Sequence, residues 1–251
     1  MMTFFSLAKP NGLVEERDGL QLVSSGLDFS AFNSALLAEP LDTVDSKAFE
    51  ARVETAARFF RARKERWSFW LCEDMVTPTV LRRVPMILRQ YRLRWSSEAP
   101  GMTVETLEPP RRTLPAIEVR RVEDVSSRAA FAGITACTFD LPYSICSEIY
   151  QSDRSWDGSM QGWVGFVNGQ PVATIAATVT PSAVGVYTVG TMPDFRRRGY
   201  SERLFREVVG ELRKQTGITR VILQATPLGY PLYHKMGFRK ATQFSIFLSE
   251  H

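Results

Sequence analysis

Apolar residues recur at helical spacing in the C-terminal half of the chain. Between residues 200 and 215, Leu204, Phe205, Val208, Val209 and Leu212 share one helix face, opposite arginines and glutamates. Two runs rich in strand-forming residues flank the Asn-Gly pair at 168–169, which predicts a hairpin. The pattern predicts strands at 117–122, 163–167, 171–179, 184–192, 220–224 and 244–248, and helices at 125–139, 144–151, 200–215 and 230–236. This order favours an α/β fold of the α+β type, with a mixed sheet flanked by helices.

A different pattern fills the first hundred residues. Helices are predicted at 29–37, 48–64 and 80–92, and strands at 67–72 and 101–107, which together indicate a second, smaller α/β domain. The prolines between Glu108 and Pro115 disfavour both helix and central strand, so we interpret residues 108–116 as a linker between domains at 1–107 and 117–251. A short helix followed by a strand occurs at 87–107 and again at 231–248. One interpretation of the N-terminal domain is therefore a degenerate half-copy of the C-terminal one.

Composition narrows the class of protein. With 251 residues, 44% hydrophobic and 23% charged, the chain is an ordinary globular sequence, which excludes disorder and collagen-like structure. Cys72, Cys137 and Cys146 lack metal-ligand spacing, and with only two histidines we expect no metal site. The N-terminus lacks a signal-peptide pattern, and no apolar run approaches the ~18–20 residues of a membrane span. We expect a cytoplasmic protein that does not bind a membrane.

The segment from Val189 to Phe205 carries the strongest chemical signal. A predicted strand leads through a proline-bearing turn, three consecutive arginines and Gly199 into the amphipathic helix. The first N–H groups of a helix and its positive dipole end favour an anion, and a pyrophosphate suits this junction. A solvated basic turn before an ordinary helix is the alternative.

Two motifs resemble those of a known family. Arg196-x-x-Gly199-x-Ser201 resembles the acyl-CoA signature Q/R-x-x-G-x-G/A of the GNAT superfamily of N-acetyltransferases, with Ser201 replacing the commoner Gly or Ala. The segment Tyr233-His-Lys-Met-Gly-Phe238 is similar to the L-Y-x-K-x-G-F segment of the same superfamily. The resemblance covers residues 117–251 and implies a mostly antiparallel GNAT sheet, acetyl-CoA as the acyl donor, and an amine acceptor that is a small molecule rather than a protein. It leaves the oligomeric state open.

The resemblance also implies roles for individual residues. The strand at 184–192 would splay from that at 220–224, and its main chain would pair with pantetheine and polarise the thioester carbonyl. Backbone amides of the arginine-rich junction would hold the pyrophosphate, and Tyr233 would protonate the departing thiolate. Thr226 stands where many members have an Asn, so Thr226 or Gln224 would replace that contact. The residues assigned to the cofactor in this way are Val189, Gly190, Thr191, Arg196, Arg197, Arg198, Gly199, Tyr200, Ser201 and Thr226.

The sequence does not identify a general base. The strand at 184–192 holds no carboxylate, and Tyr187 is interpreted as a packing residue. Three acidic residues, Glu148, Asp153 and Asp157, lie in the segment that would form the acceptor wall. Each is either a candidate general base or an ordinary surface charge. Proton transfer to solvent through a relay of water molecules is the third alternative.

Two other functions stay open at this stage. The missing strand carboxylate favours a non-catalytic acyl-CoA-binding or partner-binding protein on the same scaffold. A nucleic-acid-binding protein would use basic residues of the N-terminal half with Trp67 and Trp70, but their acidic neighbours and helical spacing favour a solvated helix face instead. The N-terminal aromatics favour core packing over an acceptor pocket. The residues in question are Arg61, Arg63, Lys64, Arg66, Arg82, Arg83, Arg89, Arg92 and Arg94, and the aromatics Phe59, Phe60, Trp67, Phe69 and Trp70.

Overall fold

The computed structural model describes residues 2–250 and divides them into two compact units. The C-terminal unit is Met102–Arg239, and the N-terminal unit is Met2–Gly101 together with residues 240–250. This division differs from the boundary expected at 108–116, because the proline-rich segment lies inside the C-terminal unit and the last strand belongs to the N-terminal one. Proline content reports local stiffness, whereas a compact unit is defined by pairing between residues that are distant in sequence.

The N-terminal unit is a sheet with the strand order β1-β2-β3-β4-β11-β5 and helices packed against it. On its longest helix, Phe49 packs edge-on against Phe69 and Phe60 stacks on Trp67, with ring centroids 5.6 and 5.0 Å apart. These rings, with Phe59, belong to the core of the unit, as the sequence favoured, whereas Trp70 is half-buried outside the core and packs against Phe244. The elements are α1 (Met2–Ser6), β1 (Leu13–Arg17), β2 (Leu20–Ser24), β3 (Ser34–Leu37), α2 (Ser46–Arg63), β4 (Ser68–Cys72), α3 (Pro78–Leu81), α4 (Val84–Gln90), β5 (Leu93–Val104) and β11 (Arg239–Ser249), with single 3-10 turns at Ser30–Phe32 and Glu73–Met75.

Three predictions for this half of the sequence are wrong. The strand expected at 101–107 is the end of the longer β5, which begins at Leu93 and stops at Val104. The helix expected at 29–37 is instead a 3-10 turn followed by strand β3, which lies between β2 and β4 in the sheet. Sheet pairing and burial have overridden local preference there. The helix expected at 80–92 is broken into α3 and α4, with Pro85 in the first turn of α4. A proline at that position lacks the N–H that would continue the preceding helix, and its ring clashes with the preceding turn.

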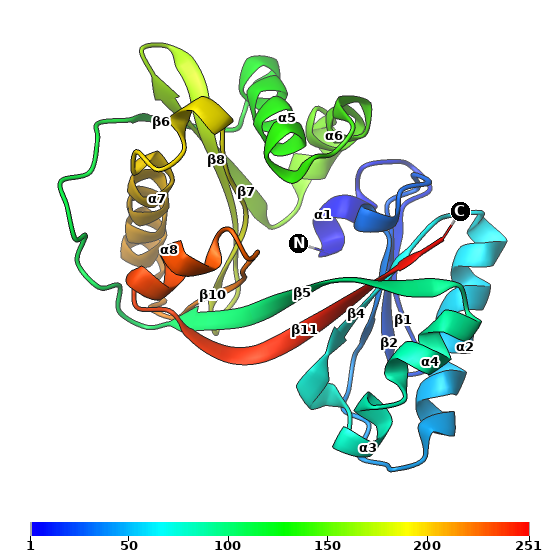
Figure 1. The fold of residues 1–251 in the computed structure, drawn as a ribbon. Coiled ribbons are helices and arrows are strands. Elements are labelled where there is room, and N and C mark those ends of the chain that lie inside the picture. Colours follow the sequence, from blue (N-terminus) through cyan, green and yellow to red (C-terminus); the bar gives the residue numbers. More distant parts are fainter. Residues whose placement is uncertain (1, 251) are drawn as a thin grey trace. The chain divides into compact units, whose positions relative to one another are not determined.

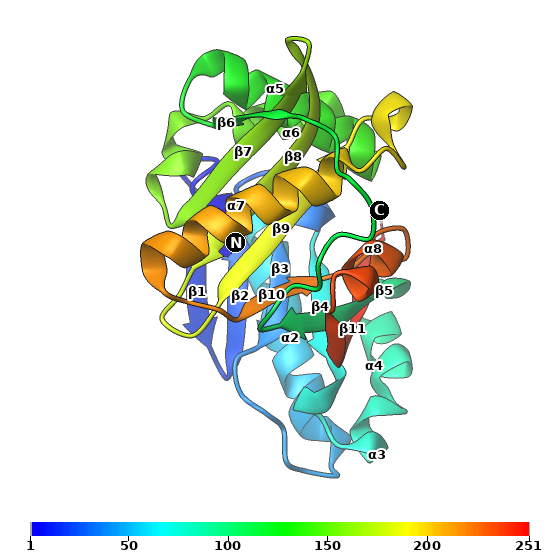
Figure 2. The ribbon, with the colours of Figure 1, turned by 90° about the vertical axis from the view of Figure 1, so that its left-hand side faces the viewer.

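The C-terminal unit is a mixed, mostly antiparallel sheet with the order β10-β9-β8-β7-β6, bordered by residues 102–104 of β5. Helix α7 covers one face, and α5 and α6 cover the other (Figure 1; Figure 2). The predicted elements and fold class are confirmed, with boundaries within three residues for every strand and helix except β11, which begins at Arg239. The elements are β6 (Glu118–Arg121), α5 (Val125–Phe139), α6 (Tyr143–Tyr150), β7 (Met160–Val167), β8 (Gln170–Val179), β9 (Val184–Thr191), α7 (Tyr200–Thr216), β10 (Val221–Gln224) and α8 (Tyr230–Lys235), with 3-10 turns at Asp153–Asp157 and Pro193–Phe195.

Local interactions explain why these elements begin and turn where they do. The side chain of Asp124 accepts a hydrogen bond from the Ser127 amide at 2.7 Å, and the Ser127 side chain returns one to the Asp124 backbone, a capping box that starts α5. This bond lowers the pKa of the Asp124 carboxyl to about 2. Asn168 and Gly169 have φ of 50° and 77° and make the tight turn between β7 and β8.

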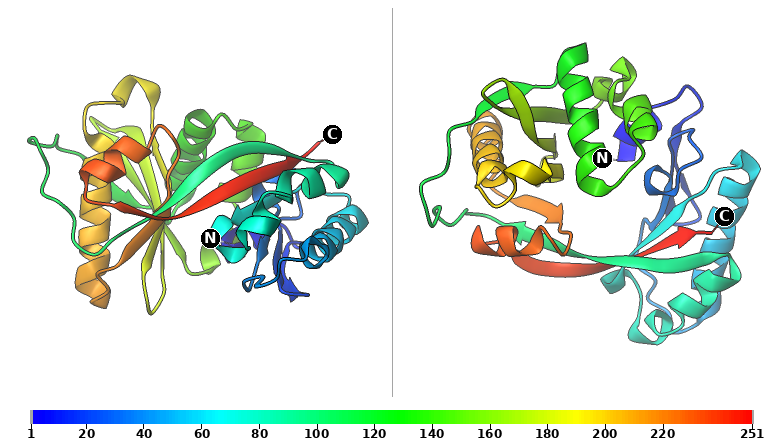
Figure 3. Two further views of the ribbon diagram at one scale, coloured as in Figure 1. Left: turned by 60° about the horizontal axis from the view of Figure 1, so that its bottom comes forward. Right: turned by 45° about the horizontal axis from the view of Figure 1, so that its top comes forward.

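The two units repeat one order of elements. In each, three antiparallel strands are followed by a helix and then by a strand parallel to the third: β1–β3, α2 and β4 in one, and β7–β9, α7 and β10 in the other. The strand that closes each unit comes from the other half of the sequence, since β11 pairs with β4 and the end of β5 borders β10. Figure 3 shows β5 and β11 as two long neighbouring strands. The repeated order agrees with the interpretation of a degenerate half-copy.

Candidate functional site

A large cavity opens where β9 and β10 part. The two strands pair only at Val184–Val221 and Gly185–Ile222, and beyond these pairs a cleft of about 1080 Å³ lies between them. The splay predicted between these strands is therefore present. Because strand pairing stops there, the edge of β9 is available to an extended ligand that adds to the sheet.

A bulge shapes the β9 wall of the cleft. The pairing of β8 with β9 shifts register between Thr174 and Ala176, and opposite this shift Thr188 has a φ of 50°. Positive φ is costly for a β-branched residue, and here the Thr174 hydroxyl donates a hydrogen bond of 3.0 Å to the Thr188 carbonyl. A bulge re-aims the main chain, so Thr188 and Val189 line the cleft.

Gly190 allows α5 to approach this strand. A Cβ at that position would lie 2.9 Å from the Thr174 hydroxyl and 3.0 Å from the Thr138 hydroxyl, so no larger residue fits. Thr138 ends on the cleft, and its buried hydroxyl has no hydrogen-bond partner within the described part of the chain. Gly190 itself does not line the cavity. It contributes to the site indirectly, by allowing α5 to pack closely against β9.

The arginine-rich junction forms one end of the cleft. Gly199 has a φ of 97°, a backbone conformation that favours glycine, and a Cβ there would make tight contacts of 3.1 Å with Pro115 Cδ and 3.2 Å with Arg112 Nη2. In residues 2–250 no side chain caps the start of α7. Its first N–H groups, together with Arg196 and Arg197, therefore present positive charge to the cleft.

The three arginines differ in what they contact. Arg196 lines the cleft and donates through Nε to the Thr191 carbonyl at 3.1 Å. Arg197 also lines it, whereas Arg198 lies over the Phe195 ring at 5.6 Å. Tyr200 packs on the same ring at 5.9 Å. Of the predicted cofactor residues, the structure brings together Val189, Thr191, Arg196, Arg197, Gly199, Ser201 and Thr226, and it leaves Gly190, Arg198 and Tyr200 out of the lining.

Tyr233 lines the cleft from α8. It is only 7% exposed and packs against Phe205 and Phe238, with ring centroids 5.9 and 5.7 Å apart. This burial raises the pKa of the phenol well above its ordinary value. The hydroxyl therefore stays protonated, and it can act as a hydrogen-bond donor inside the cleft.

The carboxylates that reach the cleft are not those named from the sequence. Glu148, Asp153 and Asp157 do not line it, Asp153 forms an ion pair with Arg128, and the side chain of Asp157 lies outside what the structure describes. Asp140 and Glu202 do line it.

Of these two, only Asp140 is suited to a charged ligand. Glu202 is held in a 2.8 Å ion pair with Arg206, in which both side chains are mostly buried. Asp140 is exposed and ends α5 with a φ of 52°. In the sequence, Asp140 could have been recognised as a candidate site residue only from its position directly after the helix predicted at 125–139.

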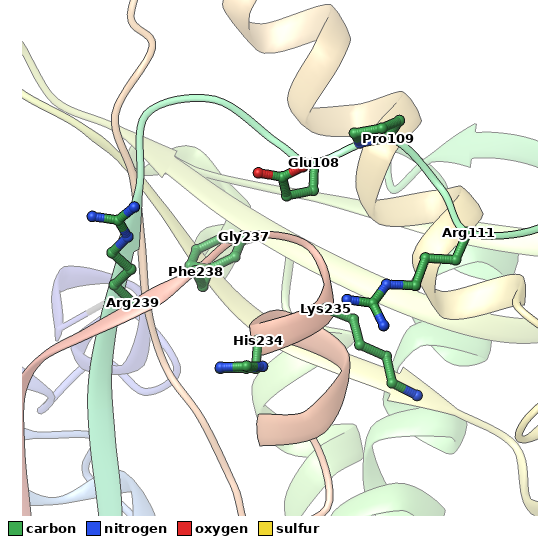
Figure 4. Close-up of a pocket in the computed structure, with 8 residues that line it drawn as sticks. All are labelled: Glu108, Pro109, Arg111, His234, Lys235, Gly237, Phe238 and Arg239. Atoms are coloured by element: carbon green, nitrogen blue, oxygen red, sulfur yellow. The ribbon is translucent and has the colours of Figure 1, made fainter.

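The proline-rich segment also contributes to the site. Arg112 Nη2 donates to the Arg197 carbonyl at 3.1 Å, and both Arg111 and Arg112 line the cleft. Arg111 borders a second cavity of about 460 Å³, which includes Glu108 and the end of α8 (Figure 4). The prolines of this segment led to its interpretation as a linker. Its two arginines, Arg111 and Arg112, were the sequence feature that could have indicated a binding site for an anion.

Several basic side chains of the N-terminal half are engaged locally. Arg63 bonds to Glu65, Arg66 to Asp28, and Arg94 to Glu250.

Two features are absent from residues 2–250. None of the helices there combines the length and apolar character needed to cross a membrane. Nor do three or more His, Cys, Asp or Glu side chains gather as a metal site in that range.

Comparison with known proteins finds one family match, in the C-terminal part of the chain. Residues 129–238 match the family model described as the acetyltransferase (GNAT) family. No curated protein matches the chain.

Solved structures share the fold over nearly the whole chain. A GCN5-related N-acetyltransferase from Kribbella flavida is 19% identical with a TM-score of 0.70, covering 100% of this chain and 93% of its own. A functionally unknown conserved protein from Staphylococcus epidermidis is 14% identical with a TM-score of 0.68, covering 97% and 96%. A GCN5-related N-acetyltransferase from Sphaerobacter thermophilus is 17% identical with a TM-score of 0.61, covering 92% and 76%. At these identities the likeness is one of fold.

Proposed function

We propose that the protein transfers an acetyl group from acetyl-CoA to an amine of an acceptor, by direct attack in a ternary complex, since residues 129–238 match the model of the acetyltransferase (GNAT) family. The observation that carries this proposal is a single cleft that holds an open strand edge, an uncapped helix start with arginines, and a buried tyrosine. These three parts suit the three parts of an acyl-CoA: an extended arm, a pyrophosphate and a thioester.

The residues present fit acetyl-CoA. The edge of β9 from Val186 to Thr191 would pair with the amides of the pantetheine arm, and the main chain near Val189 would polarise the thioester carbonyl. The start of α7 with Arg196, Arg197 and Ser201 would hold the pyrophosphate. Glycine at 199 keeps the backbone open there, where a Cβ would meet the linker.

Acetyl transfer forms a bond from the amine nitrogen to the thioester carbonyl carbon, breaks the C–S bond, and moves a proton from the amine while sulfur leaves as thiolate. Tyr233 lines the cleft and would donate a hydrogen bond to the sulfur, because its buried phenol stays protonated. The uncommitted carboxylate of Asp140 would attract a cationic amine and accept its proton, directly or through water. This assignment favours a small basic amine as acceptor.

Calorimetry with acetyl-CoA followed by an amine screen tests the function. We expect a single site on the protein and acetylated product, identified by mass spectrometry, from at least one small basic amine. Absence of any acetyl-CoA binding would refute the proposal. Binding without turnover across many amines would instead support a non-catalytic acyl-CoA-binding protein, the alternative favoured by the lack of a carboxylate on β9.

A further inference from the structure

We propose that Arg111 of the proline-rich segment and Lys235 of α8 bind the 3′-phosphate of coenzyme A. This inference rests on the proposed function and adds a second anion subsite beside the pyrophosphate site. The segment expected to be a spacer would then be a wall of the donor site.

The proline-rich segment is fixed at both ends within the C-terminal unit. At its start, the Glu108 amide donates to the Met236 carbonyl at 3.0 Å, just after α8. At its end, Arg112 bonds to the Arg197 carbonyl, and Pro115 lies against Gly199 at the start of α7. The segment therefore crosses from the end of α8 to the start of α7, and two consecutive prolines stiffen the residues before Arg111.

Arg111 and Lys235 stand where the two cavities meet. Both residues line the cleft of about 1080 Å³ and also the second cavity of about 460 Å³. Figure 4 shows the Arg111 guanidinium and the Lys235 side chain on the same side of α8, with His234 pointing to the other side. The Glu108 carboxylate in that view is turned away from Arg111, so it is not placed to neutralise the pair.

Two like charges on the same side of α8 favour an anion that both side chains can reach. Opposite charges within a few ångströms attract, and a guanidinium can bind a phosphate through two parallel hydrogen bonds. Arg239 borders the second cavity as well, so its cations outnumber the single carboxylate of Glu108. A doubly charged phosphate monoester matches this excess.

Coenzyme A carries such a group next to its pyrophosphate. Its adenosine ribose bears a 3′-phosphate monoester, and the pyrophosphate is linked to the same ribose. A ligand with its pyrophosphate at Arg196–Ser201 therefore has a second anion close by, and Arg112 connects the pyrophosphate loop to the segment that carries Arg111. Arg111 and Lys235 are exposed, so their contribution to binding depends on the negative charge of the phosphate rather than on burial of the two side chains.

Calorimetry comparing coenzyme A with 3′-dephospho-coenzyme A tests the inference. We expect the wild-type protein to bind coenzyme A about tenfold more tightly, as one charge-assisted contact provides. In Arg111→Ala and Lys235→Ala, that preference should fall to about threefold or less, with affinity for the dephospho form unchanged. Arg111→Lys should keep part of it, and Arg89→Ala, an exposed arginine of α4, should keep all of it.

The outcomes separate this inference from the proposed function. If the wild-type protein binds both ligands equally, or if both alanine variants retain the full preference, the 3′-phosphate subsite is refuted while the donor site stands. If Arg111→Ala weakens both ligands equally, Arg111 serves the shared part of the ligand and the inference is wrong. If neither ligand binds the wild-type protein, the proposed function fails and this subsite fails with it.

Discussion

Tyr233 combines two properties that act in opposite directions on catalysis. Burial raises the pKa of its phenol, which keeps the proton in place at every working pH but also makes it a weaker acid. A thiol has an ordinary pKa of about 8.5, against about 10 for tyrosine, so full proton transfer to the thiolate is unfavourable. We therefore expect the hydroxyl to act mainly as a hydrogen-bond donor to the leaving sulfur.

Replacing Tyr233 with Phe tests this role. Loss of one donor to a developing charge should lower kcat by about 10–100-fold, with the Kd for acetyl-CoA within about twofold of wild type. Tyr230→Phe on the same helix is the matched control, since Tyr230 does not line the cleft. An unchanged kcat in Tyr233→Phe would remove the tyrosine from the mechanism. Because the raised pKa keeps the phenol protonated, the wild-type rate should not fall between about pH 8 and 10 through this group.

At this scale the sequence motifs located part of the site. Arg196, Gly199 and Tyr233, which the motifs indicated, line one cleft, because those spacings are set by one turn and one helix. Asp140 and Arg111 were missed because they reach the cleft only through the end of α5 and the path of the proline-rich segment. The spacing of neighbouring residues in the sequence does not indicate that Asp140 and Arg111 reach the cleft.

Among the elements, α7 offers two glycines in contrasting environments. Gly199 precedes the first turn with a φ of 97°, and a Cβ there would lie within 3.2 Å of the proline-rich segment. Gly210 is inside the helix, and a Cβ there would meet nothing within 4 Å. The same Gly-to-Ala change should therefore have opposite effects at the two positions.

Gly199→Ala should lower the free energy of unfolding by about 1–2 kcal/mol and weaken acetyl-CoA binding, because left-handed backbone is unfavourable for alanine. Gly210→Ala should raise it by about 0.5–1 kcal/mol through helix propensity and leave binding unchanged. Urea unfolding and calorimetry would measure both. If Gly199→Ala and Gly210→Ala had the same effect on acetyl-CoA binding, position 199 would not approach the ligand.

The elements themselves were predictable where one signal dominated. The apolar face of α7 and the Asn-Gly turn between β7 and β8 are set by neighbouring residues. Residues 34–37 became β3 only because β2 and β4 flank them, and Pro85 divides a segment that otherwise has helical spacing. Pairing partners and proline position decided these cases against local preference.

For the molecule as a whole, the exchange of closing strands leads to a test by truncation. A chain ending at Arg239 keeps every residue of the 129–238 family match but loses nearly all of β11, including the buried Ile246 and Phe247. Burying a phenylalanine contributes about 3–5 kcal/mol when judged by its replacement with alanine, and β4 would also lose its antiparallel partner.

We expect this truncated protein to unfold in its N-terminal unit and to aggregate, whereas a chain lacking only Glu250 and His251 behaves as wild type. Far-ultraviolet circular dichroism and size-exclusion chromatography would show the difference. A truncated protein with wild-type helix content and a single sharp peak would contradict the importance of β11. The sequence could not indicate this dependence, because the proline-rich segment suggests a cut at 108–116 and nothing local links β4 with β11.

The position of β11 also sets an order of events during synthesis. Ser245 of β11 bonds to Glu73, 172 residues earlier, so at about 5–20 residues per second the ribosome needs roughly 10–30 s to supply that partner. During that interval β4 has emerged with one edge unpaired, and an unpaired edge is open to other chains. The half of the protein that is made first is therefore the half that completes last, and it depends on the nascent chain being protected until the final strand has been translated.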